Sequence, residues 1–325
     1  MELSTIIKER FCKDCNIPLK LFQEPYFMDR LKLYDPFFKT IEKWDIFVTE
    51  LSKYHCEQDY LEEYNRVKDS AISSIKQSKA FQRFNEEDMN QYRIQNANLP
   101  NKDIFKMIND TRAFLSIDMR KANFSSLYYY SKEIFQNTLK TVNNWEDFIA
   151  NFTKNKHIIN SKYIRQVILG NCNPKRHITY EKYLMDNILT ELLKKEYLFK
   201  ENIVFFSNDE IIMDVSEKTE GQREEIKNLI EEEIKEGKTI LSSIPLRIEL
   251  FTLYRIHGTE GYYKKISNGN HTYHIEFKCL DNYILPFVIR KFLNEEITEN
   301  DKIFYYEGRL AKLLEIPEIN QEFFS

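Results

Sequence analysis

The sequence predicts an α+β protein in which a helical N-terminal domain, residues 1–100, precedes a domain of a mixed or antiparallel sheet flanked by helices, residues 101–325. Apolar residues recur every three or four positions through the first hundred residues, which is the period of an amphipathic helix. Short apolar runs bounded by polar turns, which are typical of strands, begin only after residue 112. The 325 residues, 42% hydrophobic and 30% charged, suffice for two folded domains.

Two segments of the N-terminal half carry the helical period most clearly. One helix is expected over residues 37–51, which include Trp44 and Phe47, and another over residues 60–75. The polar segment 96–102, which contains Pro100, is the predicted domain boundary.

The second half alternates between the two patterns. Residues 113–118 form an apolar run that predicts a buried strand, and residues 203–206 and 211–213 predict a hairpin around a polar turn. The other expected helices are 122–139, one capped by Asn144, 162–169, 179–193, 220–236 and 283–293, and the other expected strands are 246–256, 262–278 with a turn at 268–270, and 303–306.

Glycine usage excludes several common enzyme classes. The chain has 7 glycines, and the first is Gly170. None of them belongs to a phosphate-binding loop, a dinucleotide-binding fingerprint or a nucleophile elbow. P-loop NTPases, Rossmann dehydrogenases and α/β-hydrolases are therefore poor interpretations of this sequence.

Charge and cysteine content predict a cytoplasmic protein. The net charge of −4 argues weakly against a protein that coats nucleic acid, but it leaves room for a local basic channel. The 5 cysteines are sparse and odd in number, as expected in a reducing compartment. We expect no secretory signal and no membrane span. Joint enrichment in Lys, Asn, Ile, Tyr and Phe indicates an AT-rich genome, such as that of a phage, a large DNA virus or a low-GC bacterium; for a virus, the compartment would be the host cytoplasm.

Asp118 ends the first predicted strand of the second domain. Strand alternation places it on one face with Phe114 and Ser116. A carboxylate at the exit of an apolar strand is unfavourable unless it is paired or binds a cation. Asp118 is therefore either a metal ligand or the cap of the following helix.

A second acidic position lies at the tip of the predicted hairpin. Asp209 and Glu210 occupy a turn where glycine or Asn-Gly is more favourable, and their adjacent carboxylates repel each other. This placement suggests a bound divalent cation, whereas an ordinary solvated turn is the alternative.

A basic cluster separates the two acidic positions. Residues 152–182 contain seven Lys or Arg side chains and one acidic residue, Glu181. Lys162 and Arg165 are three residues apart and share a helix face, and Lys175 and Arg176 follow at the next helix. Such a cluster suits a polyphosphate or a nucleic-acid backbone, and a solvated basic surface is the alternative.

The order of these segments resembles the palm and fingers of family A nucleic-acid polymerases, over about residues 112–216. Residues 206–211, Phe-Ser-Asn-Asp-Glu-Ile, resemble the family's apolar-x-His-Asp-Glu-apolar pattern, with Asn208 in place of the His. The two acidic positions, 118 and 209, lie closer together than in that family.

The resemblance implies a palm-like sheet and nucleotidyl transfer to a 3′ end by two Mg²⁺ or Mn²⁺ ions. The partners that it implies for the protein are a nucleoside triphosphate and a DNA or RNA primer or template. The implied metal ligands are Asp118 and Asp209, assisted by Glu210, and the implied nucleotide-binding residues are Lys162, Arg165 and Gln166, with Lys175 and Arg176 holding the triphosphate or the template backbone.

Three other functions remain open. The acidic balance also fits a non-enzymatic interaction protein, for example a viral one. A palm that only binds nucleic acid is another possibility, and a metal-dependent nuclease using the same carboxylates is the third. Convergence of the carboxylates of Asp118 and Asp209 is required by every interpretation that involves a metal at these residues.

Two further sets of potential metal ligands are expected not to bind metal. Cys12 and Cys15 form a C-x-x-C pair without a second pair at zinc-knuckle spacing, although His55 and Cys56 could complete a set. We expect two buried helix cysteines instead. His271 and His274 are expected on opposite faces of a strand, which prevents them from sharing a metal.

Overall fold

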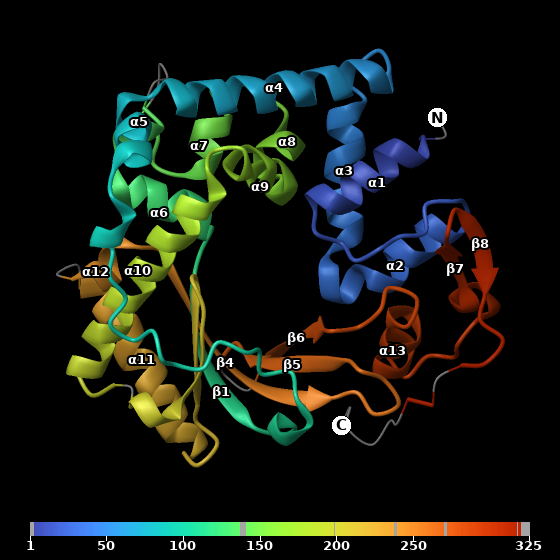
Figure 1. Cartoon of the computed structure of the whole chain (residues 1–325). Coiled ribbons are helices and arrows are strands. Elements are labelled where there is room, and N and C mark those ends of the chain that lie inside the picture. The colour runs from blue at the N-terminus through green and yellow to red at the C-terminus, as the bar shows by residue number, and fades with distance from the viewer. Residues whose placement is uncertain are drawn as a thin grey trace.

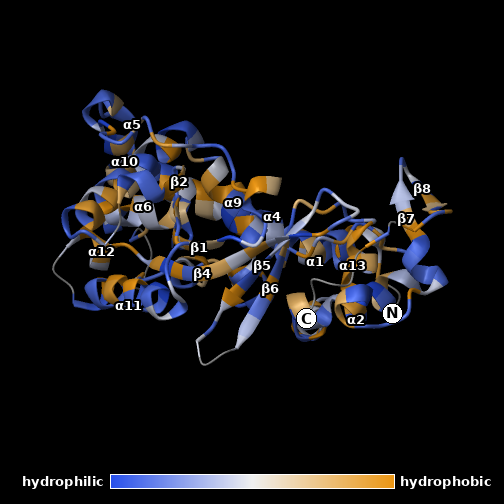
Figure 2. Ribbon diagram, turned by 90° about the horizontal axis from the view of Figure 1, so that it is seen from below, coloured by the Kyte–Doolittle hydropathy of each residue, from blue (hydrophilic) through white to orange (hydrophobic). Residues whose placement is uncertain are grey.

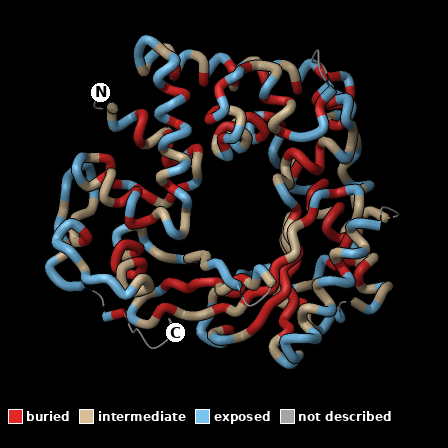
Figure 3. Tube along the Cα trace, turned by 180° about the vertical axis from the view of Figure 1, so that it is seen from behind, coloured by how far each residue is buried: buried red, intermediate tan, exposed pale blue. Residues whose placement is uncertain are grey.

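The computed structural model describes residues 3–136, 141–197, 199–236, 239–269, 272–316 and 318–319. Its backbone traces a ring, in which helix α4 (Glu57–Gln77) lies opposite a six-stranded sheet (Figure 1). Figure 3 shows the ring from behind, with buried residues concentrated along the strands and in the helices packed on them. The predicted α+β class is confirmed.

The N-terminal block is helical, as predicted, but its second helix is interrupted. The expected helix over 37–51 is divided at Lys39, whose φ of 50° places it in the left-handed region that ends a helix. The helices are α1 (Thr5–Asp14), α2 (Tyr26–Phe38), α3 (Thr40–Leu51), α4 and α5 (Lys79–Glu86).

The helices of the second half follow the predictions with shifted ends. The helix expected over 122–139 ends at Tyr130, because Ser131 is extended; residues 137–140 lie outside the described residues. Another helix begins at Pro174 rather than at Thr179, since proline is favoured in a first turn, where its missing N–H is not needed. These helices are α6 (Ala122–Tyr130), α7 (Trp145–Ile149), α8 (Lys156–Asn160), α9 (Lys162–Gly170), α10 (Pro174–Lys194), α11 (Glu220–Glu236), α12 (Ile240–Ser243) and α13 (Leu285–Phe292).

The six strands are antiparallel throughout, in the order β2-β3-β1-β4-β5-β6. Helices α6 to α10 connect β1 to β2, and α11 and α12 connect β3 to β4, so the first four strands form a split βαβ motif. The predicted strands are confirmed, and β8 was not predicted. Their bounds are β1 (Ala113–Met119), β2 (Ile203–Phe206), β3 (Glu210–Asp214), β4 (Leu246–Arg255), β5 (Tyr262–Ser267) and β6 (Tyr273–Lys278), with a separate hairpin of β7 (Ile303–Tyr306) and β8 (Arg309–Lys312).

The main hydrophobic core lies on one face of the sheet. Leu115 and Ile117 of β1 point to this face and belong to the same cluster as Leu184 of α10 and Ile230 of α11. Burial of these side chains holds the two helices against the sheet. Figure 2, seen from below, shows α10, α11 and α12 gathered around β1 and β4, away from α1, α2 and α13.

The opposite face of the sheet is apolar at one end and polar at the other. Phe114, Phe251 and Ile266 form a small cluster covered by Ile104. Farther along β1 on the same face come Ser116 and then Asp118. We call this the open face of the sheet.

Buried polar contacts tie the N-terminal helices to the rest of the chain. Arg30 of α2 forms an ion pair with Asp301, at 2.8 Å, in which both side chains are at least 95% buried. Asp14 of α1 accepts hydrogen bonds from Tyr64 of α4 and from Ser161, the residue before α9. The main hydrophobic cluster also runs through both halves, and the division at residue 100 stays a prediction.

Candidate functional site

The backbone of the sheet brings Asp118 beside the hairpin tip. Asp118 is paired in register with Glu210 on β3, and the amide of Met119 donates to the carbonyl of Asp209, at 2.8 Å. The hairpin therefore places the residues of both acidic positions at the same end of the sheet. Among the described residues, Asp118, Asp209 and Glu210 are not a group whose ligand atoms all lie within 4.8 Å of one another, so the convergence of their carboxylates on a metal stays a prediction.

The three carboxylates repel one another. The pKa of Asp118 is raised to about 6, mainly by burial and also by the nearby Glu210 and Asp209, although Arg247 opposes the shift. The Asp118 side chain is 24% exposed, so solvent screens the repulsion only in part. Hard oxygen ligands in such a cluster are the kind that Mg²⁺ and Mn²⁺ prefer, and a bound cation would relieve the repulsion.

Hydroxyl groups order the acidic turn. Ser207 donates its backbone N–H to the carbonyl of Glu210, at 2.9 Å, which closes a two-residue loop. The Ser207 hydroxyl donates to Asp209 Oδ1, at 3.0 Å, and Ser116 Oγ donates to Glu210 Oε1, at 2.6 Å. The turn needs no glycine, because neither Asn208 nor Asp209 has a positive φ, and the serine hydroxyls add hydrogen bonds that fix it.

Helix α10 supports the tip from the other side. Asn208 donates from Nδ2 to Glu181 Oε2, at 2.9 Å, and Glu181 is 96% buried. The pKa of Glu181 is raised to about 7, mainly by burial and also by Asp209, although the hydrogen bond from Asn208 opposes the shift. Sequence reasoning missed Glu181, although it was the one acidic residue in the basic cluster.

Two of the predicted basic residues lie on α9. Burial and the neighbouring cations Arg165, Lys278 and Arg247 lower the pKa of Lys162, while Asp118 opposes them. Lys162 therefore lies near the carboxylate cluster and among other cations. Burial also lowers the pKa of Arg165, whose Nε has no hydrogen-bond partner among the described residues.

The other predicted phosphate-binding residues have different surroundings. Gln166 lines a cavity of about 390 Å³ with Lys13, Lys20 and Phe277, and Lys175 is exposed on the first turn of α10. Arg176 is a structural residue: its guanidinium donates to the carbonyls of Phe84, at 2.7 and 3.0 Å, and of Glu87, at 2.5 Å. A run of basic residues in the sequence cannot show that backbone carbonyls already accept the hydrogen bonds of one of them, Arg176.

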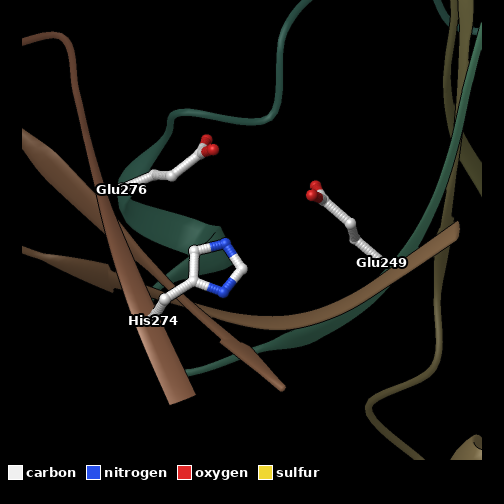
Figure 4. Close-up of side chains that lie close together, drawn as sticks. All are labelled: Glu249, His274 and Glu276. Carbon is white, nitrogen blue, oxygen red and sulfur yellow. The ribbon is translucent and has the colours of Figure 1, made fainter. Parts of the chain in front are cut away.

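A second polar group lies farther across the open face. Glu249 of β4 and His274 and Glu276 of β6 point toward one another, with ligand atoms within 4.8 Å (Figure 4). Among the described residues this is the group found with metal-ligand geometry. His271, the other histidine considered above, lies outside the described residues.

Cations already balance this group. Arg247 Nη1 lies 3.2 Å from Glu249 Oε1, and Lys278 Nζ lies 2.9 Å from Glu276 Oε2. Although burial opposes it, the cations Lys278, Lys264 and Arg247 lower the pKa of Glu276. Two carboxylates among three cations have little residual attraction for a metal, so we interpret the group as an ion-pair network.

The cysteine pair shows no sign of a metal site. Cys12 is buried and Cys15 is half-buried at the end of α1, and neither belongs to the metal-ligand group found among the described residues. Burial raises the pKa of both thiols, to about 12 for Cys15, which disfavours the thiolate that a metal needs. The absence of metal binding at this pair stays a prediction.

Comparisons with protein-family models, with curated proteins and with solved structures found no match to this chain. Within the described residues, no helix combines the length and the apolar character needed to cross a bilayer.

Proposed function

We propose that this protein transfers nucleotides to the 3′ end of a nucleic acid. The observation that carries the proposal is the gathering of Asp118, Asp209 and Glu210 at one end of a split βαβ sheet, with Lys162 of α9 nearby. The proposal rests on this geometry and on the resemblance of residues 112–216 to polymerase palm and fingers segments.

The three carboxylates would hold two Mg²⁺ or Mn²⁺ ions. When bound, such ions lower the pKa of an attacking hydroxyl and stabilise a leaving pyrophosphate. Asp118 at the end of β1 and Asp209 in the turn between β2 and β3 would supply oxygen ligands, and Ser116 orients Glu210 by its 2.6 Å hydrogen bond.

The basic side chains of α9 would hold the triphosphate. Lys162 and Arg165 are three residues apart on α9, and Lys162 is exposed and lies among other cations, whereas Arg165 is half-buried near Glu146. An anion bound beside this helix would be attracted by both charges. Interactions that strengthen as charge develops on pyrophosphate lower the barrier to transfer.

The test is an incorporation assay. The chain is incubated with Mg²⁺ or Mn²⁺, labelled ribo- or deoxynucleotides and a panel of primers and templates, and product length is read on a gel. We expect extended products that vanish in Asp209→Asn but persist in Glu201→Gln, a control that removes an exposed acidic residue just before the same hairpin. Products of equal yield from Asp209→Asn and wild type would contradict the proposal.

One observation favours a second candidate, a palm-like protein that binds nucleic acid without catalysis. Arg247 forms an ion pair with Asp118, at 3.1 Å, and so supplies a cation within the protein itself. This candidate predicts that labelled oligonucleotides bind with the same affinity with and without Mn²⁺, and that no primer is extended.

A further inference from the structure

Arg247 lies between two carboxylates on the open face. Its Nη2 lies 3.1 Å from Asp118 Oδ2, and its Nη1 lies 3.2 Å from Glu249 Oε1. The register of β1 and β4 fixes this arrangement, because Arg247 pairs directly with Asp118. The guanidinium therefore occupies space beside an oxygen that the proposed metal would need.

Arg247 has a second acidic partner, Glu249, besides Asp118. Although burial opposes it, Glu249, Asp118 and Glu276 together raise the pKa of Arg247, so its charge is stabilised from two sides. The side chain is 43% exposed, and its Nε has no hydrogen-bond partner among the described residues. Arg247 can therefore release Asp118 and still keep Glu249.

Another cation, Lys162 of α9, lies near Arg247. Lys162 lies close enough to Arg247 and Lys278 for these cations to lower its pKa. Cations that converge from a helix and from a sheet repel one another until an anion lies between them. A guanidinium also matches phosphate oxygens in a two-pronged geometry.

We propose that Arg247 is a positioning residue that couples metal binding to nucleotide binding: it pairs with Asp118 in the metal-free protein and turns to the nucleotide phosphates when divalent cations bind. This inference rests on the proposed function. Metal and nucleotide then favour each other, because each is bound best when Arg247 has left Asp118.

The proposal predicts effects of opposite sign for one substitution. Arg247→Gln removes a cation that competes with metal, so Mn²⁺ binds more tightly, by roughly two- to five-fold for a partly exposed charge pair. The same substitution removes a phosphate contact, so inorganic triphosphate binds about 10- to 150-fold more weakly in saturating Mn²⁺. A residue that served only the fold would change both affinities in the same direction or neither.

The experiment measures Mn²⁺ binding by titration calorimetry, and then triphosphate binding by equilibrium dialysis in saturating Mn²⁺. It is run at about pH 8, above the usual range of carboxyl groups. Arg112→Gln is the matched control, because Arg112 pairs with Asp214 and is 40% exposed, much like Arg247. Arg247→Lys keeps the charge but cannot contact Asp118 and Glu249 at once, so its Mn²⁺ and triphosphate affinities should lie between those of wild type and Arg247→Gln. This variant replaces Arg247→Gln if the latter does not fold.

The outcomes separate the two claims. Tighter Mn²⁺ and weaker triphosphate binding in Arg247→Gln, with Arg112→Gln unchanged, supports the coupling. Unchanged or weaker Mn²⁺ binding in Arg247→Gln overturns the coupling but leaves the proposed function in place. If no Mn²⁺ binds to wild type or to any variant, the proposed function itself fails, and the coupling fails with it.

Discussion

Asp14 and Asp118 are both carboxylates whose side chains are mostly buried, yet their surroundings differ. Asp14 is 98% buried and accepts hydrogen bonds from Tyr64 and Ser161, at 2.8 and 2.6 Å, while His157 Nε2 lies 3.1 Å from its second oxygen. Asp118 is partly exposed, has one cationic partner, and lies beside Glu210 and Asp209.

The difference separates a structural acid from the acid that we propose to be functional. The partners of Asp14 come from α4, α8 and the start of α9, so its hydrogen bonds join helices and leave no room for a ligand. Burial and the carboxylates of Glu210 and Asp209 raise the pKa of Asp118 although Arg247 opposes them, so a bound cation could stabilise the ionised form of this group. Such perturbed carboxylates are more common at functional sites than in structural networks.

Loss of the Asp14 carboxylate should have the largest effect on stability. Asp14→Ala leaves two hydroxyls and an imidazole without their acceptor, so we expect a loss of about 3–5 kcal/mol in the free energy of unfolding. Urea unfolding measures this quantity. Asp14→Asn keeps an acceptor oxygen and should lose less stability. A loss below about 1 kcal/mol in Asp14→Ala would show that Asp14 is not a structural residue.

Arg165 and Arg176 allow the same comparison between a proposed functional residue and a structural one to be made for cations. Arg165→Ala should lower kcat/KM for incorporation by about 10- to 150-fold, because one charge-assisted contact contributes roughly 1.5–3 kcal/mol, and should leave the fold intact. Arg176→Ala should instead lower the free energy of unfolding by about 1–3 kcal/mol, since it leaves two carbonyls without their donor. The pair is measured by incorporation kinetics and urea unfolding, and a reversed pattern would show that the two roles are misassigned.

The smallest effect is expected at Glu181, with a characteristic pH dependence. The pKa of this carboxyl is raised to about 7 in the folded chain, above its value in the unfolded chain, so the folded state binds the proton more tightly. Stability therefore falls as pH rises from about 4 through about 7, and the full loss is present at about pH 8. Glu181→Gln should stabilise the protein there by about 1–2 kcal/mol and match wild type near pH 4.

Thermal or urea unfolding across this pH range tests the prediction. Glutamine can still accept the hydrogen bond from Asn208, so the substitution changes the charge and not the contact. A constant difference between the two proteins at every pH would show that Glu181 does not titrate as its burial implies.

Local patterns in the sequence were sufficient to predict the elements that carry the acidic residues. Strand β1, the hairpin of β2 and β3, and helix α9 follow from alternation, apolar runs and helical period. The open-face residues Arg247, Glu249 and Glu276 could not be predicted, because ordinary polar positions in a strand become neighbours only once the strand order and register are known.

Failures of prediction had the same origin. The charge run does not show that the guanidinium of Arg176 donates to nearby carbonyls, so its role as a phosphate ligand stays a prediction. The interruption at Lys39 depends on a backbone angle that the apolar period does not encode. Glu181 was missed because its contact with Asn208 joins residues 27 positions apart.

Mn²⁺-dependent stability tests the central claim most directly, namely that the Asp118 cluster is built to be neutralised by a divalent cation. Metal that binds only the folded chain stabilises it by RT ln(1 + [L]/Kd), or about 2.7 kcal/mol at 100 times Kd. The account predicts that Mn²⁺ raises the melting temperature of wild type and of Glu201→Gln, but not of Asp118→Asn or Asp209→Asn. An unchanged melting temperature in wild type, or an equal rise in Asp209→Asn, would contradict it.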